Sequence, residues 1–251
     1  MHRPRISTIA LLAPTIATAA VFIAACSGRS EEPILQQYFT ASRLRDTQTL
    51  ANFATVSFEP SQEGSVQSFT ITNVSSEQKE PLHIKELAKA HEQAKAEADE
   101  FTKRKRAYQN ENREAIDRVL KAEGQRGRLR GKDAEVQAAW AKWRDETNQY
   151  TKKVSEARMK LANERPIAEL SVSDPRRGNL TDVTKYDGEM ITKEVTLNAQ
   201  VRQPNSGAVV PKTLLVTMQR AVLKGDDGKK IEGRWVITRL KDAGSGGAKT
   251  S

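Results

Sequence analysis

The middle third of the chain carries its most regular pattern of apolar and polar positions. Between Val136 and Leu161, mostly apolar residues recur at alternating steps of four and three residues. This spacing places them along one stripe of an α-helix, as in the seam of a coiled coil. A looser stripe of the same kind runs from Leu87 to Val119. The pattern predicts two long helices whose stripes face each other.

The segment between these two helices, GQRGRLRGKD, indicates a turn. Gly124, Gly127 and Gly131 interrupt the helical pattern, and Asp133 stands where it can cap the second helix. We therefore predict an antiparallel coiled-coil hairpin over residues 80–165, with its tip near 124–132. At 1.5 Å per residue, an arm of about 33 residues reaches about 50 Å.

The regions on both sides of the hairpin have shorter patterns. Residues 33–45 place their apolar positions on one helical face, and a second short helical piece follows. VQSFTITNV, residues 66–74, is rich in β-branched residues and predicts a strand. After Pro166 the turn sequences QPNSG and GDDGKKIEG separate three strand-like runs, residues 194–202, 212–224 and 234–240. This order predicts an antiparallel meander.

Together these elements predict an α+β fold. N-terminal helices pack on a curved antiparallel sheet of about four strands, and the helical hairpin interrupts this domain between residues 33–79 and 166–243. The Gly-rich residues 244–251 are expected to be disordered. The order of elements and the closing GRWVITRL run resemble the α+β roll of nuclear transport factor 2-like and cystatin-like domains. The resemblance implies a sheet that wraps a helix, and the inserted hairpin departs from the usual pattern.

The first 25 residues have the three parts of an export signal. Arg3 and Arg5 precede an uncharged, Ala-rich apolar stretch, and small residues lead up to Cys26. The stretch is just long enough to cross a bilayer, but Pro14 interrupts it, so a cleaved signal is the better interpretation.

The residues Ile23-Ala24-Ala25-Cys26 resemble the lipobox of bacterial lipoproteins. The resemblance implies cleavage after Ala25, a diacylglycerol on Cys26, acyl chains such as palmitate that anchor the chain in a membrane, and a short polar tether over residues 26–32. Ser27 and Gly28 follow the cysteine without an acid at the second position, which by the same resemblance favours the periplasmic face of an outer membrane. The alternative is an ordinary secretory signal that ends near a cysteine by chance.

Composition limits the partners and the means of stabilisation. Cys26 is the only cysteine in 251 residues, so no intrachain disulfide can form and the fold relies on packing. From residue 26 onward the chain has 39 basic and 32 acidic side chains, a formal excess of seven positive charges. This modest excess in an exported chain argues against nucleic acid as a partner.

Candidate catalytic residues are scarce. His83 and His91 are separated by about 12 Å along a helix, which is too far to share a metal ion. No nucleophile elbow or phosphate-binding loop is present. Asp174, Asp182 and Asp187 are spaced too irregularly to specify a calcium loop or an acid/base pair. We therefore predict no catalytic residue, no metal, no cofactor and no enzymatic activity.

The predicted tip is the strongest candidate for a binding surface. Four basic residues fall within seven positions with no acid among them: Arg126, Arg128, Arg130 and Lys132. Such a cluster suits anionic lipid headgroups, an acidic envelope protein or an anionic polymer. The alternative is a solvated turn that charge keeps soluble.

Trp140 and Trp143 lie on the stripe of the second helix, three residues apart. They either pack against the partner helix or form an aromatic anchor for a binding partner. The favoured function is a membrane-anchored envelope lipoprotein that acts as a non-catalytic interaction module through its arm. One alternative is a domain that binds a small apolar ligand inside the roll. The wall of its pocket would be formed by aromatic and apolar side chains: Phe39, Phe53, Phe69, Met218 and Trp235. The other alternative, by fold analogy, is an envelope enzyme.

Overall fold

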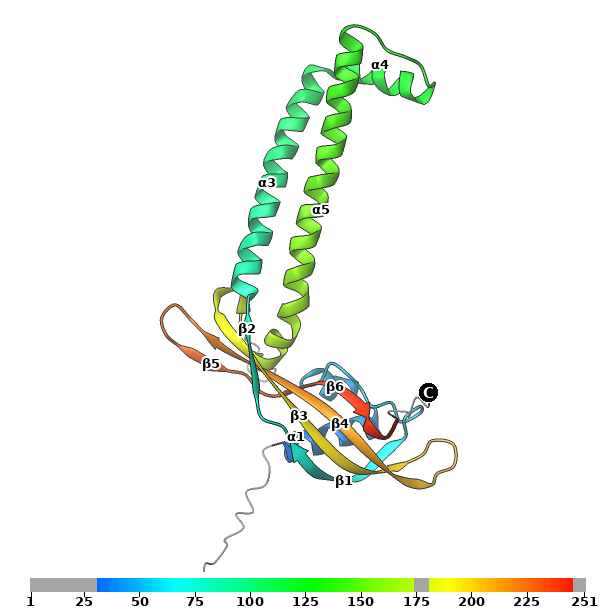
Figure 1. Cartoon of the computed structure of the whole chain (residues 1–251), viewed down its shortest axis with the longest axis vertical. Coiled ribbons are helices and arrows are strands. Elements are labelled where there is room, and N and C mark those ends of the chain that lie inside the picture. The colour runs from blue at the N-terminus through cyan, green and yellow to red at the C-terminus, as the bar shows by residue number, and fades with distance from the viewer. Residues whose placement is uncertain (1–30, 174–180, 246–251) are drawn as a thin grey trace, which may run out of the picture.

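A computed structural model describes residues 31–173 and 181–245 of the chain. It has an α+β fold, in which a curled antiparallel sheet with two N-terminal helices forms a roll and a long helical arm projects from one end of the sheet (Figure 1). The predicted fold class is confirmed. The roll and the arm have separate apolar clusters, described below.

Two helices open the roll. Helix α1 (Glu32–Leu44) has Pro33 in its first turn, where a missing N–H costs nothing, and ends at Arg45 in a left-handed conformation. Helix α2 (Thr47–Ala51) is capped by Asp46, whose carboxylate accepts a hydrogen bond from the Thr49 N–H at 3.0 Å. The apolar face of α1, which includes Leu35 and Tyr38, is fully buried against the sheet.

The sheet is built around one long hairpin of two 16-residue strands, β3 (Asp187–Arg202) and β4 (Val209–Lys224). On the free edge of β3 lie β1 (Ser65–Val74) and β2 (Gln78–Leu82), each paired with a different half of β3. On the free edge of β4 lie β6 (Val236–Asp242) and β5 (Lys230–Glu232). The four longer strands correspond to the predicted sheet, and the short β2 and β5 are additions.

The β3–β4 hairpin presents opposite faces to the two parts of the molecule. Toward α1 it buries side chains of one parity, such as Val195 and Leu197 on β3. Toward the base of the arm it buries side chains of the other parity, such as Met190 on β3 and Leu223 on β4. Since successive strand residues point to opposite faces, one continuous hairpin can be the floor of the roll and the support of the arm.

The arm consists of three helices, α3 (Ile84–Glu111), α4 (Arg113–Gly124) and α5 (Lys132–Val172). Helices α3 and α5 lie side by side and antiparallel, and α4 turns aside at the far end (Figure 1). The first helix predicted from the stripe therefore breaks at Asn112, which has φ −115° and ψ 20°. Its side-chain amide donates to the Tyr108 carbonyl at 3.0 Å and so competes with the helical ladder.

Helix α5 differs from the prediction at both ends. It begins without a side-chain cap, and Asp133 pairs with Arg118 instead of capping the helix. It also continues through Pro166 to Val172, beyond the predicted end of the hairpin at residue 165. Proline removes one helical hydrogen bond, but the last turns are held by tertiary contacts. Ser171 Oγ donates to the Arg234 carbonyl at 2.8 Å and accepts from the Ala221 N–H at 3.0 Å.

Candidate functional site

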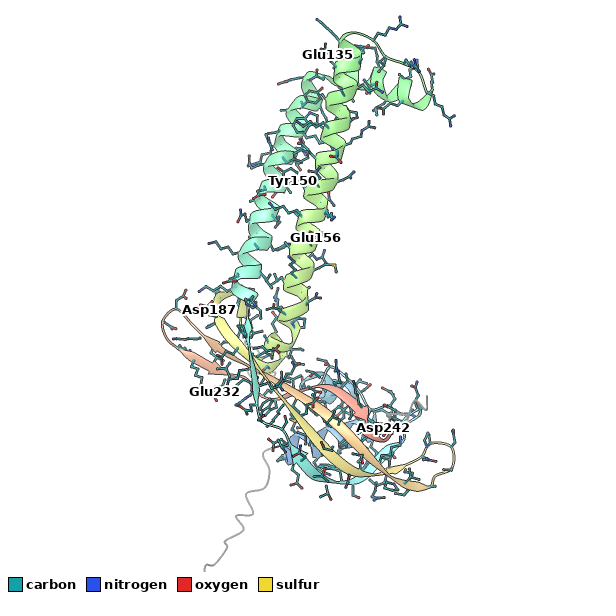
Figure 2. All side chains as sticks on the ribbon, viewed as in Figure 1. Glu135, Tyr150, Glu156, Asp187, Glu232 and Asp242 are labelled. Atoms are coloured by element: carbon teal, nitrogen blue, oxygen red, sulfur yellow. The ribbon has the colours of Figure 1, made fainter. Side chains whose placement is uncertain are left out.

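The interior of the arm is lined by aromatic side chains. Phe101 stacks on Tyr150 with ring centroids 4.6 Å apart, and the Trp143 ring lies 5.3 Å from Phe101 and 5.6 Å from Tyr108. Trp140 is only 7% exposed. The structure thus places Trp140 and Trp143 in the seam of the arm, where Trp140 is buried and Trp143 is partly buried against neighbouring aromatic rings. Figure 2 shows the side chains along this arm, from Glu135 at its far end to Glu156 nearer the sheet.

A small apolar cluster fixes α4 to the far end of α5. It contains Ile116 and Val119 of α4 and Trp140 of α5, all buried. Leu129 of the following loop is partly buried against the same cluster. The short α4 is therefore held through one apolar face, while its other face is exposed.

Two bidentate ion pairs clasp α4 to α5. Arg118 donates to both carboxylate oxygens of Asp133 at 2.8 and 3.0 Å, and Arg144 donates to both oxygens of Glu123 at 2.8 and 2.9 Å. These hydrogen bonds to arginine lower the pKa of the Asp133 and Glu123 carboxyl groups below their usual values. The charges of these two arginines are thus used within the arm.

The basic loop, which we define as residues 125–131 together with Lys132, leaves its charges unpaired. Arg126, Arg128, Arg130 and Lys132 are exposed, and their side chains make no hydrogen bond or ion pair with any residue that the structure describes. The loop lies at the far end of the arm, between α4 and α5 (Figure 1). The four predicted cations therefore lie exposed on one loop, whereas Trp140 and Trp143 lie in the seam of the arm.

Positive charge is concentrated in this part of the molecule. Residues 103–144 contain thirteen basic and six acidic side chains, whereas the rest of the chain from residue 26 onward contains 26 of each. The far third of the arm thus holds the entire formal excess of seven charges. A surface of this kind attracts anionic partners over a distance of about one Debye length, 8–10 Å.

Sequence reasoning missed one part of this region, the run Lys103-Arg104-Lys105-Arg106 on α3. Lys105 turns inward, where its Nζ donates to Thr147 Oγ1 at 2.8 Å and lies 5.3 Å from the centre of the Trp140 ring. Arg106 is exposed. The four consecutive cations were visible in the sequence, but only the structure shows that Lys105 is partly buried while its neighbours Lys103, Arg104 and Arg106 are exposed.

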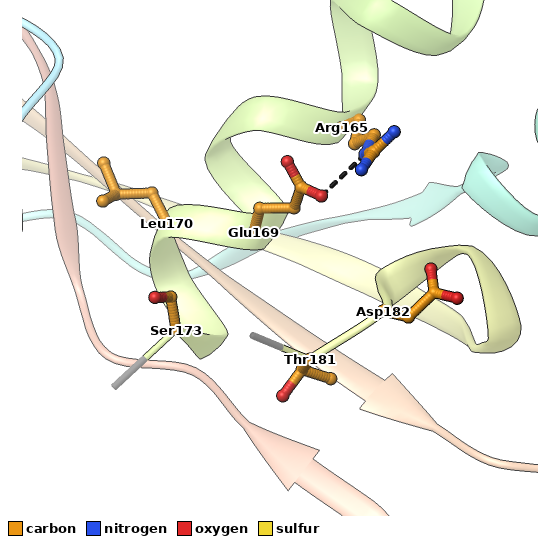
Figure 3. A pocket seen from close by; sticks show the side chains of 6 residues that line it. All are labelled: Arg165, Glu169, Leu170, Ser173, Thr181 and Asp182. Atoms are coloured by element: carbon orange, nitrogen blue, oxygen red, sulfur yellow. Dashed lines mark hydrogen bonds and ion pairs between the residues drawn. The ribbon is translucent and has the colours of Figure 1, made fainter. Parts of the chain in front are cut away.

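Side chains at the base of the arm surround a pocket of about 480 Å³ (Figure 3). Within it, Arg165 Nε donates to Glu169 at 2.6 Å. Asp182 accepts from both Thr184 N–H and Thr184 Oγ1, and these hydrogen bonds lower its pKa. The pocket is open to solvent, and the charged side chains that line it have polar partners. Six residues form the lining: Arg165, Glu169, Leu170, Ser173, Thr181 and Asp182.

The remaining candidate acids and histidines also have structural partners. Asp187 pairs with Lys85 at 3.3 Å, His83 lies 3.7 Å from Glu164, and Asp174 falls outside the described residues. Among residues 31–173 and 181–245, no group of three or more potential metal ligands converges.

A buried ion pair lies where the roll begins. Lys193 of β3 donates to Glu31, and the two side chains are 5% and 9% exposed. Lys193 Nζ also lies 3.8 Å from the centre of the Trp235 ring, whose surroundings include Arg220 at 4.7 Å. Of the predicted tether over residues 26–32, the structure describes only Glu31, which is held by this pair, and Glu32, where α1 starts.

Several residues of the expected pocket wall belong to the core of the roll. Phe39, Phe53 and Met218 are buried there, and Phe69 and Trp235 are partly buried against the same cluster. A hollow of about 20 Å³ beside Phe39 and Phe69 opens at the surface, where the exposed Gln36 and Arg43 also line it. This volume holds about one water molecule.

The predicted lipid-attachment residue Cys26 and cleavage residue Ala25 lie outside the described residues. Within the described ranges, none of the helices has the length and apolar character needed to span a bilayer. Comparisons with known proteins found no match to this chain among family models, curated proteins or solved structures.

Proposed function

We propose that this chain is a non-catalytic interaction protein of the bacterial cell envelope, and that the far end of its arm is the contact surface. The observation that carries the proposal is the concentration of all excess positive charge in residues 103–144. Four of these cations, those of the basic loop, are exposed and have no partner among the described residues. A partner with complementary negative charge would complete this surface.

The architecture supports a division of roles, in which the roll is the base and the arm carries the contact surface away from it. The 28 residues of α3 extend over about 42 Å, so the basic loop is held tens of ångströms from the sheet. The seam of the arm is packed with aromatic rings, which stiffen it. A stiff arm positions its far end without the entropy that a flexible chain of the same length would lose on binding.

Anchoring through Cys26 is the second part of the proposal. It rests on the lipobox resemblance at residues 23–26 and on the export signal before it. Since α1 starts six residues after Cys26, an acylated chain would hold the roll next to the membrane. Mass spectrometry of the mature N-terminus should find an acylated Cys26, and Cys26→Ser should shift the protein from the membrane to the soluble fraction. An unmodified Cys26, or full membrane retention of the variant, would refute the anchor.

The contact surface is tested by co-sedimentation of the chain from residue 26 onward, carrying Cys26→Ser, with envelope fragments of the native cell. A variant with glutamine at all four cations of the basic loop should lose most of its binding. The matched control has glutamine at four exposed lysines outside this surface, which removes the same charge: Lys89, Lys95, Lys160 and Lys241. Equal losses for both variants would show that net charge alone, and not the far end, determines retention.

A further inference from the structure

One side chain of the basic loop packs on the arm, and the cations on either side of it are exposed to solvent. No helix or strand is present between Gln125 and Gly131, and the loop runs as an open connection from the end of α4 to the start of α5 (Figure 1). Leu129 is the one loop side chain that is partly buried, against the cluster around Trp140. Arg128 and Arg130, on the two sides of this partly buried residue, are exposed.

The cations of the loop follow one another closely along the chain. They occupy every second position up to Lys132, the first residue of α5, and residues two apart are separated by at most about 7 Å. Arginine guanidinium groups bind phosphate with two parallel hydrogen bonds, which makes them better suited to phosphate than lysine is. Three arginines and one lysine in a row match several phosphates in series better than they match one compact anion.

A bilayer surface and a protein partner both match the surroundings of the loop less well than a chain of phosphates does. Peripheral binding to lipid combines basic residues with apolar or aromatic side chains that enter the interface. At the far end of the arm Leu120, at 47% exposure, is the one large exposed apolar side chain among the described residues. The aromatic rings of this region, including Trp140 and Trp143, lie in the seam. A protein interface would likewise need an apolar centre, which this surface lacks.

We infer that the basic loop binds a linear envelope polymer that carries phosphate groups in series. This inference rests on the proposed function and specifies its partner. The exposed row of Arg126, Arg128, Arg130 and Lys132 would pair with successive phosphates, and the contact of Leu129 with the arm would hold the row in place. Each phosphate that is neutralised releases condensed counterions, so binding should weaken steeply with salt.

The test measures binding of the Cys26→Ser chain from residue 26 onward to three probes at equal total phosphate. The probes are long-chain inorganic polyphosphate, tripolyphosphate and phosphatidylglycerol vesicles. We expect long polyphosphate to bind most tightly, with a log–log salt slope of about −3 for four contacts, by analogy with single-stranded nucleic acids. The four-glutamine variant of the loop should bind at least about 100-fold more weakly, and the Lys89, Lys95, Lys160 and Lys241 control should bind within about threefold of the unchanged chain.

Four outcomes would overturn the inference. Vesicles that bind as tightly as polyphosphate would indicate a lipid surface, tripolyphosphate that binds as tightly would indicate a site for one compact anion, and binding unaffected by the loop variant would place the contact elsewhere. If polyphosphate does not bind while the loop variant still loses its retention on envelope fragments, this inference fails and the proposed function stands. If the loop variant keeps full retention on the fragments, the proposed function fails as well.

Discussion

The roll and the far end of the arm are stabilised in different ways. The roll buries a continuous cluster from α1, α2, β1, β3, β4 and β6, with several fully buried side chains such as Leu35 and Leu197. The far end buries a cluster of three residues around Trp140 and supplements it with two ion pairs. The difference shows that a thin projecting surface can be kept ordered by few contacts when a large core elsewhere provides the stability of the chain.

Removing one member of the buried ion pair should have the largest effect on the roll. Lys193→Met removes the cation that pairs with the buried Glu31 carboxylate, which should lower the free energy of unfolding by about 3–5 kcal/mol. Combining it with Glu31→Leu should restore much of the loss, because both charges of the pair are then removed. Urea denaturation followed by circular dichroism measures both. A double variant as unstable as the single one would show that the desolvated charge is not the cause.

Truncation of the apolar core should come next. Leu197→Ala removes a fully buried side chain and should lower the free energy of unfolding by about 2–5 kcal/mol. Leu120→Ala, at an exposed site on α4, is the matched control and should change it by less than about 0.5 kcal/mol. Similar denaturation midpoints for the two variants would contradict the assignment of the main core to the roll.

The same kind of truncation at the far end should act locally. Trp140→Ala empties the small cluster that holds α4, so the amides of α4 and of the basic loop should lose hydrogen-exchange protection. The amides of α1 should keep theirs, and the denaturation midpoint of the roll should hardly change. A loss of protection that extends to α1 would mean that the arm and the roll unfold as one unit.

Acidification should loosen the far end by a smaller amount. The pKa values of Glu123 and Asp133 are lowered by their arginine partners, so the stability from these pairs is present above the ordinary values of 4.5 and 3.8 and is lost as the pH falls through the lowered values. Between pH 6 and pH 3, protection factors in α4 should fall relative to those in α1. The double variant Arg118→Gln, Arg144→Gln should remove this difference, and an unchanged difference would assign it to other groups.

Much of the fold could be predicted because its determinants are local. The four-three stripe identified the facing sides of the arm, and Ala94, Phe101 and Leu161 are buried as it requires. The break at Asn112 was hidden because Ala115 and Val119 continue the stripe after the helix has changed direction. The continuation through Pro166 depends on contacts of Ser171 with distant backbone, which no local pattern contains.

The exposed charges of the candidate site could be predicted from the sequence, but the packing of the residues around them could not. Exposed cations at a glycine-rich turn follow from polarity alone. The placement of Trp140 between α4 and α5 depends on the change of direction at Asn112, and so does the anchoring of Leu129. Lys193 could have been suspected, because it shares the inward parity of Val195 and Leu197 on β3, but its partner Glu31 is 162 residues away.

Position-specific photo-cross-linking in the native cell would locate the contact surface on the full chain. A photoreactive amino acid is introduced either at Arg128, in the basic loop, or at Lys160, an exposed position in the half of α5 nearer the sheet. If the far end is the contact surface, Arg128 should give a discrete adduct and Lys160 should give little or none. Equal adducts at both positions, or an adduct at Lys160 alone, would contradict it.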